Sequence, residues 1–518
     1  MKIERTKNAT RSIAAGVGLR LFQTVIPFLM RTAMIHFMGV EYLGLNSLFS
    51  SILHILNLAE LGVGYAMVYS MYKPIAEDDE DRICALMGLY RKYYRVIGLV
   101  IGAVGLALTP FVPSLITGEV PAELNIYWLY LLNLGATVLT YWLFAYRNCL
   151  LQAHQRMDIA SIITMASSSV QFLLQFLILV LWKNYYLYVI VLLLSTVVNN
   201  LLTALVTMKK YPQYKPRGTL EKSEVKEING KIRDLFSGKL GSVVLQHADT
   251  VVISAFLGLT MLAIYQNYYF IMSAVIAMVE ILISSITAGL GNSFVTETKE
   301  KNYNDLLKFS FLFLWLIGIC ICCFLSLYQP FMEIWVGSEL MLGFGVVVCL
   351  SAYFFVLSMS RFLSVFKDAA GLWHQDRFRP LASALVNLTL NLLTVRKLGI
   401  YGIVLSTVLA KVLVGLPWLI YNLFTYMFDR TQLKGFLKQL LGFVAVMALA
   451  GAAVCGICLP ISLNPWAKMA VCVAVCAVVP NGLFYLLMHR SPQFAPSVQF
   501  ADRITKGKLK LEKRLLRG

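Results

Sequence analysis

RLFQTVIPFLMRTAMIHFMGVEYLGLNSLFSSILHILNLAELGVGYAMVYSMYKP, residues 20–74, decides the fold of this chain. It consists of two long apolar segments joined by a short turn, GVEYLG, at residues 39–44. Arg20, Arg31, His54 and Glu60 interrupt the apolar runs. A charge in the hydrocarbon of a bilayer costs about 2.5–3.5 kcal/mol on insertion scales, so such groups usually face a water-filled cavity. The stretch therefore predicts two membrane helices that line the polar passage of a transporter.

The composition extends this prediction to the whole chain. Of the 518 residues, 58% are hydrophobic and only 14% are charged, whereas a soluble domain is about 25% charged. The mean hydropathy is +0.71. Apolar runs of 18 or more residues are long enough to cross a bilayer as helices, and a β-barrel would instead show short alternating segments. We therefore expect an all-α polytopic membrane protein. Its fourteen predicted spans lie at about 12–37, 43–71, 86–109, 125–150, 158–182, 185–207, 238–257, 262–290, 306–327, 341–365, 379–396, 401–427, 438–459 and 467–487.

The basic residues predict the orientation. The net charge is +18, but 38 of the 45 Lys and Arg residues fall in the two tails and in alternate connections between spans. This is the pattern that keeps positive loops in the cytoplasm, so we expect a multi-pass protein of the bacterial cell (inner) membrane with both termini in the cytoplasm, and no nucleic-acid partner. The predicted outer connections are short, which places binding within the membrane or at the cytoplasmic face. They lie at 38–42, 110–124, 183–184, 258–261, 328–340, 397–400 and 460–466.

An internal repeat divides the chain. Phe37, Gly39 and Leu43 in FMGVEYL recur 219 residues later as Phe256, Gly258 and Leu262 in FLGLTML. Two six-span halves in the same orientation predict a pseudo-two-fold axis along the membrane normal, with a substrate site between the halves. The predicted parts are a six-helix bundle at 1–207, an amphipathic cytoplasmic linker at 208–237 that lies in the membrane interface, a second bundle at 238–427, two extra spans at 428–489 and a basic tail at 490–518.

Two segments carry a resemblance to a known family. Residues 36–80, with the GVEYLGLN turn and the LAELGVG segment, closely resemble the first hairpin of Wzx-type polysaccharide flippases. Residues 247–271, HADTVVISAFLGLTMLAIYQNYYFI, are similar to the seventh and eighth spans of the same family. The family belongs to the MOP superfamily, together with the MATE drug exporters and the lipid II flippase. The resemblance implies transport of an undecaprenyl-diphosphate-linked oligosaccharide to the outer leaflet by alternating access.

Polar residues within the spans are the candidate site. Arg31 is predicted to bind a diphosphate or acidic sugars, and Arg20 either pairs with Glu60 or forms a cytoplasmic gate with it. Asp249 is predicted to pair with Arg31 or to take up a proton or Na⁺. The full predicted substrate set is Arg31, Arg20, His54, Asn57, Asn46, Tyr265, Gln266 and Lys411, and the predicted ion-coupling or gating set is Glu60, Asp249 and His247.

Several of these residues have a structural alternative. A histidine on a membrane helix is more often a satisfied hydrogen-bonding group than a proton relay, and a tyrosine near the outer face is ordinarily an interface anchor. The ten cysteines, including the CxxC of Cys455 and Cys458, are read as small apolar fillers, with no metal site. Pro27 predicts a kink in the first span.

The remaining expectations concern partners and rival functions. We expect no cofactor other than a coupling Na⁺ or proton, membrane lipid and a lipid-linked glycan as ligands, a monomeric chain, and a functional association with a polysaccharide polymerase. The alternative transport function is a MATE-like exporter of cationic small molecules, which needs an acidic cavity. A membrane enzyme such as a polymerase or glycosyltransferase is disfavoured by the short outer connections. The lack of P-loop and HExxH motifs argues against ATP-driven transport and zinc hydrolysis.

Overall fold

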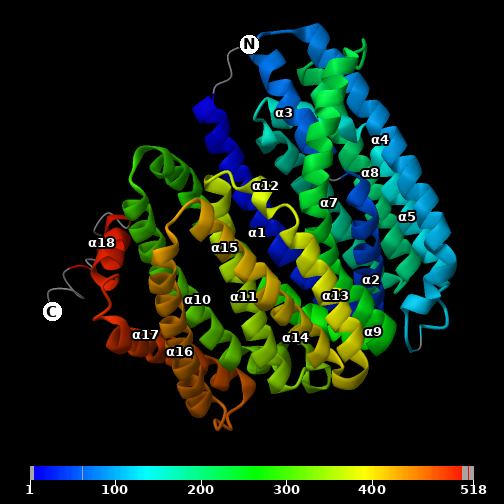
Figure 1. Ribbon diagram of the computed structural model, residues 1–518. Helices are drawn as coiled ribbons and strands as arrows, with labels where there is room; N and C mark the ends of the chain where they lie inside the picture. Colours follow the sequence, from blue (N-terminus) through cyan, green and yellow to red (C-terminus); the bar gives the residue numbers. More distant parts are fainter. Residues whose placement is uncertain (1–4, 61, 119, 505–511, 513–518) are drawn as a thin grey trace. The chain divides into compact units, whose positions relative to one another are not determined.

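The computed structural model describes residues 5–60, 62–118, 120–504 and 512, and every regular element in these ranges is a helix (Figure 1). The chain forms two compact units, which divide between Gln266 and Asn267. Unit 1 contains α1 (Arg5–Phe37), α2 (Val40–Leu56), α3 (Val63–Ala76), α4 (Glu80–Leu108), α5 (Ile126–Trp142), α6 (Asn148–Ala153), α7 (Met157–Leu181), α8 (Tyr185–Lys210) and the first part of α9 (Lys222–Thr296). Unit 2 contains the rest of α9, α10 (Lys299–Val336), α11 (Phe344–Ala369), α12 (Trp373–Asp376), α13 (Arg379–Leu398), α14 (Ile400–Ala410), α15 (Leu416–Tyr426), α16 (Leu433–Cys458), α17 (Pro465–Met488) and α18 (Phe494–Ile504).

The helices confirm the all-α membrane fold. Among the described residues, ten helices are long and apolar enough to cross a membrane, or eleven when α5 and α6 count as one bent span. The prediction counts more spans for two reasons. The long helix α9 covers the predicted spans 238–257 and 262–290, and neither α1 nor the pair α2–α3 is among the ten. Each of the fourteen predicted spans therefore coincides with helical structure, and Pro27 lies inside the continuous helix α1.

Two predicted spans are broken rather than continuous. The second span stops at the end of α2, passes through a 3₁₀ turn at Asn57–Glu60 and resumes as α3 after Gly62. Gly62 has φ 95° and ψ −28°, a left-handed conformation that ends a helix and suits glycine. The fourth span bends by 48° between α5 and α6, where Phe144 has φ 59°. Hydropathy does not predict these breaks, because both segments remain apolar throughout.

The two turns of the internal repeat share one backbone conformation. Gly39, between α1 and α2, has φ 124° and ψ 166°, and Gly258, within α9, has φ 89° and ψ 172°. Both φ values lie in the region that side chains disfavour, so glycine is required where one helix ends and the next begins. Leu43 and Leu262, which follow the two glycines at the same spacing, are both buried. The internal repeat is therefore present in the backbone conformation as well as in the amino-acid sequence.

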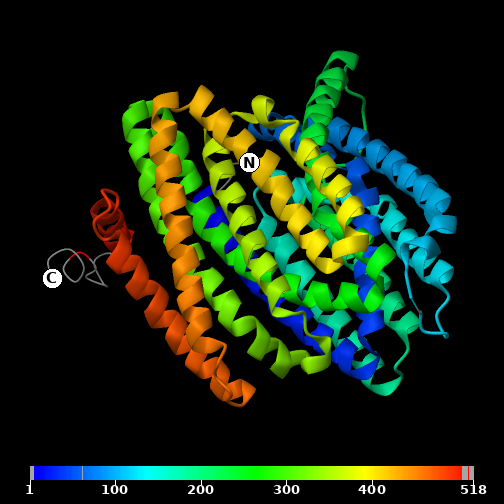
Figure 2. The same ribbon diagram turned by 60° about the horizontal axis from the view of Figure 1, so that its bottom comes forward.

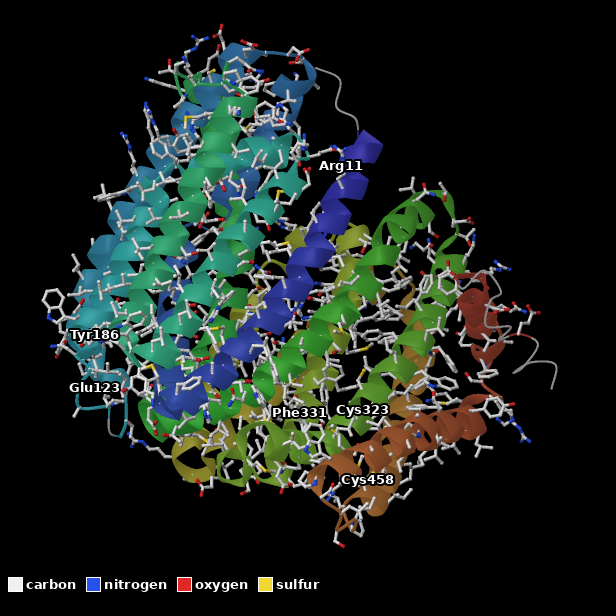
Figure 3. The ribbon with its side chains drawn as sticks, turned by 180° about the vertical axis from the view of Figure 1, so that it is seen from behind. Arg11, Glu123, Tyr186, Cys323, Phe331 and Cys458 are labelled. Atoms are coloured by element: carbon white, nitrogen blue, oxygen red, sulfur yellow. The ribbon has the colours of Figure 1, made fainter. Side chains whose placement is uncertain are left out.

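The predicted outer connections of unit 1 meet at one end of that unit. The Tyr42 hydroxyl, at the end of the turn 38–42, donates to Glu123 in the connection 110–124. The backbone N–H of Asn125 donates to the Tyr186 hydroxyl at 2.7 Å, next to the connection 183–184. Figure 3 shows Glu123 and Tyr186 near each other, with Arg11 at the opposite end of α1. Because consecutive predicted spans run in opposite directions, every second connection between them lies at the same end of the unit.

The segment 208–237 differs from its prediction. After a loop at 211–221, residues from Lys222 onward form one helix that continues into the seventh predicted span, so it is not a separate helix lying in the interface. Side chains hold this extension against α4: Arg82 Nη2 lies 2.8 Å from Glu224 Oε1, and the Tyr93 hydroxyl donates to Asn229 Oδ1 at 2.6 Å. These contacts place the first part of α9 in unit 1, whereas the sequence predicts the boundary before it.

In unit 2, the two extra predicted spans pack on α10. Helices α16 and α17 lie side by side and both contact α10 (Figure 2). Cys322, Cys458, Cys472 and Cys476 are buried together between these helices, where they act as the apolar fillers expected from the sequence. Within the described part of the chain, no group of three or more His, Cys, Asp or Glu side chains is arranged to hold a metal ion.

The chain then forms a short helix that was not predicted. In α18 the ring of Phe500 meets that of Phe309 on α10, with centroids 4.9 Å apart in an edge contact. Residues 505–511 and 513–518 of the predicted basic tail lie outside the described residues.

Candidate functional site

Two predicted histidines stack on each other in unit 1. His54, near the end of α2, and His247, in the first part of α9, have ring centroids 4.9 Å apart and planes inclined by 14°. His247 Nδ1 also lies 3.4 Å from Ser51 Oγ, one turn before His54 on α2. His54 remains exposed and His247 is half-buried. The structure thus joins two residues 193 positions apart into one polar contact between α2 and α9.

Glu60 lies on the 3₁₀ turn that breaks the second span, and tyrosines surround its carboxylate. The Tyr141 hydroxyl donates to Oε2 at 2.7 Å, and the Tyr94 hydroxyl donates to Oε1. Tyr90 donates in turn to the Tyr94 hydroxyl at 2.8 Å. Hydrogen bonds from phenols allow a carboxylate to remain within an apolar bundle. Sequence reasoning missed these tyrosines, although Tyr90 and Tyr94 stand four positions apart in a predicted span.

Lys239, on the first part of α9, interacts electrostatically with Glu60. Its ammonium lies 3.5 Å from the ring centroid of Tyr65, on α3, and within Coulombic range of Glu60. The predicted Arg20–Glu60 pair is not among the ion pairs of the described residues, and Arg20 is exposed on α1. A cation over an aromatic face is stabilised without a formal ion pair.

The other predicted residues of unit 1 occupy different surroundings. Arg31 is half-buried on α1 and interacts electrostatically with Tyr188 of α8. Asp249 and Tyr265 are both buried. Gln266 Nε2 donates to Thr250 Oγ1 at 2.9 Å, beside Asp249 in sequence.

Two asparagines complete the predicted set on α2. Asn46 is half-buried near the start of the helix. Asn57 follows its last residue, and its buried Oδ1 lacks a hydrogen-bond partner among the described residues. Asn57 therefore retains an acceptor for a water molecule or a ligand.

Lys411 belongs to unit 2, where it is buried at the start of a π-helical turn, Lys411–Gly415, between α14 and α15. π-Helical turns inside α-helices are frequent at functional sites. In the same unit, Arg361 of α11 forms an ion pair with Glu280 of α9. That pair neutralises one of the acidic groups that the sequence places within the spans.

We use the name polar column for Ser51, His54, Glu60, Lys239 and His247, which lie on α2, the following 3₁₀ turn and the first part of α9. The column combines a carboxylate, an ammonium and two imidazoles with neighbouring phenols. Such groups exchange protons and hydrogen-bond hydroxyl-rich ligands, which suits binding and gating in a transporter.

Comparison with known proteins identifies the chain's relatives. Residues 10–286, more than half of the chain, match the family described as "Polysaccharide biosynthesis protein". No curated protein matches the sequence.

Solved structures share the fold at low identity. A lipid II flippase, MurJ, in an inward closed conformation has a TM-score of 0.66 and 14% identity, covering 92% of this chain and 98% of its own. An inward-facing multidrug resistance MATE family transporter of the MOP superfamily has a TM-score of 0.62 and 15% identity, covering 82% of this chain and 99% of its own. A MOP superfamily transporter from Pyrococcus furiosus Vc1 has a TM-score of 0.53 and 14% identity, with 83% and 96% covered. Together these matches show that the chain has the fold of the MOP superfamily transporters.

Proposed function

Because this chain belongs to the family of polysaccharide biosynthesis proteins, we propose that it is a flippase for a lipid-linked oligosaccharide. The family match carries the proposal, and the MOP transporter fold supports movement of a substrate rather than its chemical conversion. The cargo is an undecaprenyl-diphosphate-linked glycan, which crosses the bacterial cytoplasmic membrane by alternating access. The basic inner connections support cytoplasmic termini in that membrane.

Cationic side chains would bind the anionic part of such a substrate. Arg31 and Arg20 lie eleven positions apart on α1, which is close to three helical turns, so they share one face of that helix. A guanidinium binds a diphosphate oxygen pair through two parallel hydrogen bonds. Lys411 is the corresponding candidate of unit 2. The amide and imidazole groups of Asn46, Asn57, Gln266 and His54 would contact sugar hydroxyls.

The polar column supplies the candidates for coupling and gating. Glu60 sits at the break of a discontinuous span, a position where transporters often place ion sites. Asp249 and His247 lie two positions apart on α9. We assign Glu60, Asp249 and His247 to uptake of a proton or Na⁺, and the chain acts as a monomer alongside the polymerase that consumes its product.

A MATE-like exporter of cationic small molecules is the second candidate, and the shared fold favours it. Charge argues for the flippase. The spans hold the cations Arg20, Arg31, Lys239 and Lys411 against the acids Glu60 and Asp249, and Glu280 is paired with Arg361, so the balance is not acidic. For the Pyrococcus furiosus transporter, reverse polarity of the binding pocket suggested a different function. By the same reasoning, the cationic groups in the spans of this chain favour an anionic substrate over the cations that a drug exporter carries.

A flipping assay in proteoliposomes tests the proposal. Wild type is compared with Arg31→Ala and Asp249→Asn for translocation of a lipid-diphosphate oligosaccharide, and Lys183→Ala is the control because it removes an exposed cation from the same unit. We expect transport by wild type and by the control, and a loss of at least about tenfold in Arg31→Ala, as follows from one charged hydrogen bond. Export of a cationic dye along a Na⁺ or proton gradient, with no movement of the glycolipid, would instead support the exporter.

A further inference from the structure

Helix α3 carries an exposed stripe of tyrosines. Tyr65, Tyr69 and Tyr72 stand at positions i, i+4 and i+7, which lie on one face of a helix. They are 67%, 63% and 47% exposed, whereas Met67 and Met71 of the same helix are fully buried. The rings of Tyr69 and Tyr72 contact each other edge to face, with centroids 6.4 Å apart. We use the name tyrosine stripe for Tyr65, Tyr69 and Tyr72.

Two lysines of α9 lie against the tyrosine stripe. The Lys239 ammonium is 3.5 Å from the ring centroid of Tyr65, and the Lys231 ammonium is 4.9 Å from that of Tyr69. Lys231 also pairs with Glu227, at 2.8 Å. An ammonium has three donors, so one that lies over a ring face retains donors for an anion. The surface therefore combines aromatic faces with positive charge, which suits a ligand that has both C–H groups and acidic oxygens.

The position of Lys231 shows that the tyrosine stripe reaches into water. The apolar span of α9 begins at Lys239, and Lys231 lies eight positions before it in the charged stretch KEINGKIRD, residues 226–234. Eight positions are about 12 Å of helix. The ring of Tyr69 beside Lys231 therefore lies beyond the end of this span and does not act as an anchor in the bilayer. Exposed apolar surface in water, formed by neighbouring side chains, indicates a binding surface.

We infer that the tyrosine stripe, with Lys231 and Lys239, binds a glycosyl diphosphate. The aromatic faces pack on the C–H faces of the first sugars, and the two ammonium groups bind the oxygens of the adjacent diphosphate as point charges. The stripe extends about 10 Å from Tyr65 to Tyr72, so it is longer than one sugar ring. The class of ligand follows from the proposed function, on which the site rests. The basic residues predict that this end of unit 1 is cytoplasmic, where such a substrate is first bound.

Titration calorimetry of the purified full-length protein tests the site. The probes are glucosyl farnesyl diphosphate, farnesyl diphosphate without sugar and glucosyl methyl diphosphate without lipid, in an amine-oxide detergent because the sugar of a maltoside would compete. We expect the glucosyl lipid to bind at least about fivefold more tightly than farnesyl diphosphate. Equal binding of the methyl compound assigns the glycosyl diphosphate itself as ligand, and weaker binding assigns the lipid-linked form. Equal binding of the two farnesyl compounds, or of neither, would overturn the inference.

Tyrosine variants identify the surface that binds the sugar. Tyr65→Leu and Tyr69→Leu remove a ring from an exposed position, so each should lower the affinity for the glucosyl lipid about fivefold and leave that for farnesyl diphosphate unchanged. Tyr69→Phe keeps the ring and should bind as wild type does. Tyr127→Leu is the matched control, because Tyr127 is an exposed tyrosine of α5 in the same unit and outside the stripe. Wild-type affinity in both stripe leucine variants would refute the site.

A lysine variant separates the charge from the rings. Lys231→Gln should weaken binding of both farnesyl compounds by a similar factor, since each carries the diphosphate. Lys92→Gln, which removes an exposed cation of α4, should leave both affinities unchanged. Equal losses in the two lysine variants would assign the effect to net charge and remove Lys231 from the site.

Flipping by the same proteins distinguishes this site from the proposed function. Transport of the glycolipid by wild type, together with unchanged binding in the stripe leucine variants, would refute the site and leave the flippase in place. Binding that depends on Tyr65 and Tyr69, in a wild type that moves no glycolipid, would retain the site and refute the flippase.

Discussion

Thr260 Oγ1 donates a hydrogen bond to Glu41 Oε1 at 3.2 Å, and these residues are separated by the same 219 positions that relate the two halves of the sequence. Leu259 follows one repeat glycine, and its carbonyl oxygen lies where a side chain at Gly44 would begin. Thr117 closes the same region, because its N–H donates to the Ser254 carbonyl at 3.0 Å. Contact between equivalent residues is what a local two-fold axis between the two turns produces.

Gly44→Ala should separate these turns. A Cβ at this position would lie 2.3 Å from the carbonyl oxygen of Leu259, a backbone atom that cannot rotate away. Overpacking of this kind costs about 1–3 kcal/mol. We expect loss of cross-linking between cysteines introduced by Glu41→Cys and Thr260→Cys, mapped by peptide mass.

Gly135→Ala is the matched control for this experiment, since a Cβ there has no neighbour within 4 Å. It should leave the cross-link intact. If Gly44→Ala cross-links as efficiently as the control, the close approach of the two turns is wrong.

Tyr141→Phe should destabilise unit 1 through Glu60. The variant removes a 2.7 Å hydrogen bond to the carboxylate, and such bonds to charged groups contribute about 1.5–3 kcal/mol. The expected result is a lower unfolding temperature in detergent. Tyr127→Phe, on an exposed part of the same helix, should change little. Combination of Tyr141→Phe with Glu60→Gln should recover part of the loss, because a neutral amide needs less solvation.

The contact between Arg82 and Glu224 should couple α4 to the first turn of α9. Arg82 donates to one carboxylate oxygen through Nε at 3.0 Å and Nη2 at 2.8 Å, yet both side chains remain partly exposed. A double-mutant cycle with Arg82→Gln and Glu224→Gln should give a coupling free energy of about 0.2–1 kcal/mol that decreases with salt. Lys92→Gln, an exposed cation on α4, should show no coupling with Glu224.

Acidification should weaken the packing around His154, which follows α6. The imidazole is buried beside the rings of Tyr211 and Tyr214, at centroid distances of 4.4 and 5.7 Å. Burial lowers the pKa of His154, while the hydrogen bond from Nδ1 to the Leu150 carbonyl opposes this effect. The unfolded chain therefore binds the proton more readily, so stability is present above an unfolded pKa of about 6.5 and declines below it.

Unfolding measured at pH 7.5 and at pH 5.5 checks this prediction. Wild type should lose more stability on acidification than His154→Gln, which has no imidazole to protonate. An equal loss in the two proteins would remove His154 as the cause.

The sequence alone predicts the helices better than it predicts their partners. Apolar runs of the length needed to cross a bilayer identify each span, because length and hydropathy are local properties. The breaks at Gly62 and Phe144 depend on single left-handed residues in segments that stay apolar. Glu60 and His247 were recognisable as polar groups in apolar surroundings, but their contacts with Tyr141 and His54 come from distant parts of the chain.

The unbroken first part of α9 has a mechanical consequence. From Lys222 to Leu257 the helix has no non-helical residue, which gives a rod of about 54 Å. A tilt of about 5° around one end would move the other by about 5 Å over that length. A small tilt of the helix at the contact of Glu224 with Arg82 therefore displaces His247 and the turn at Gly258, which lie farther along the same rigid helix.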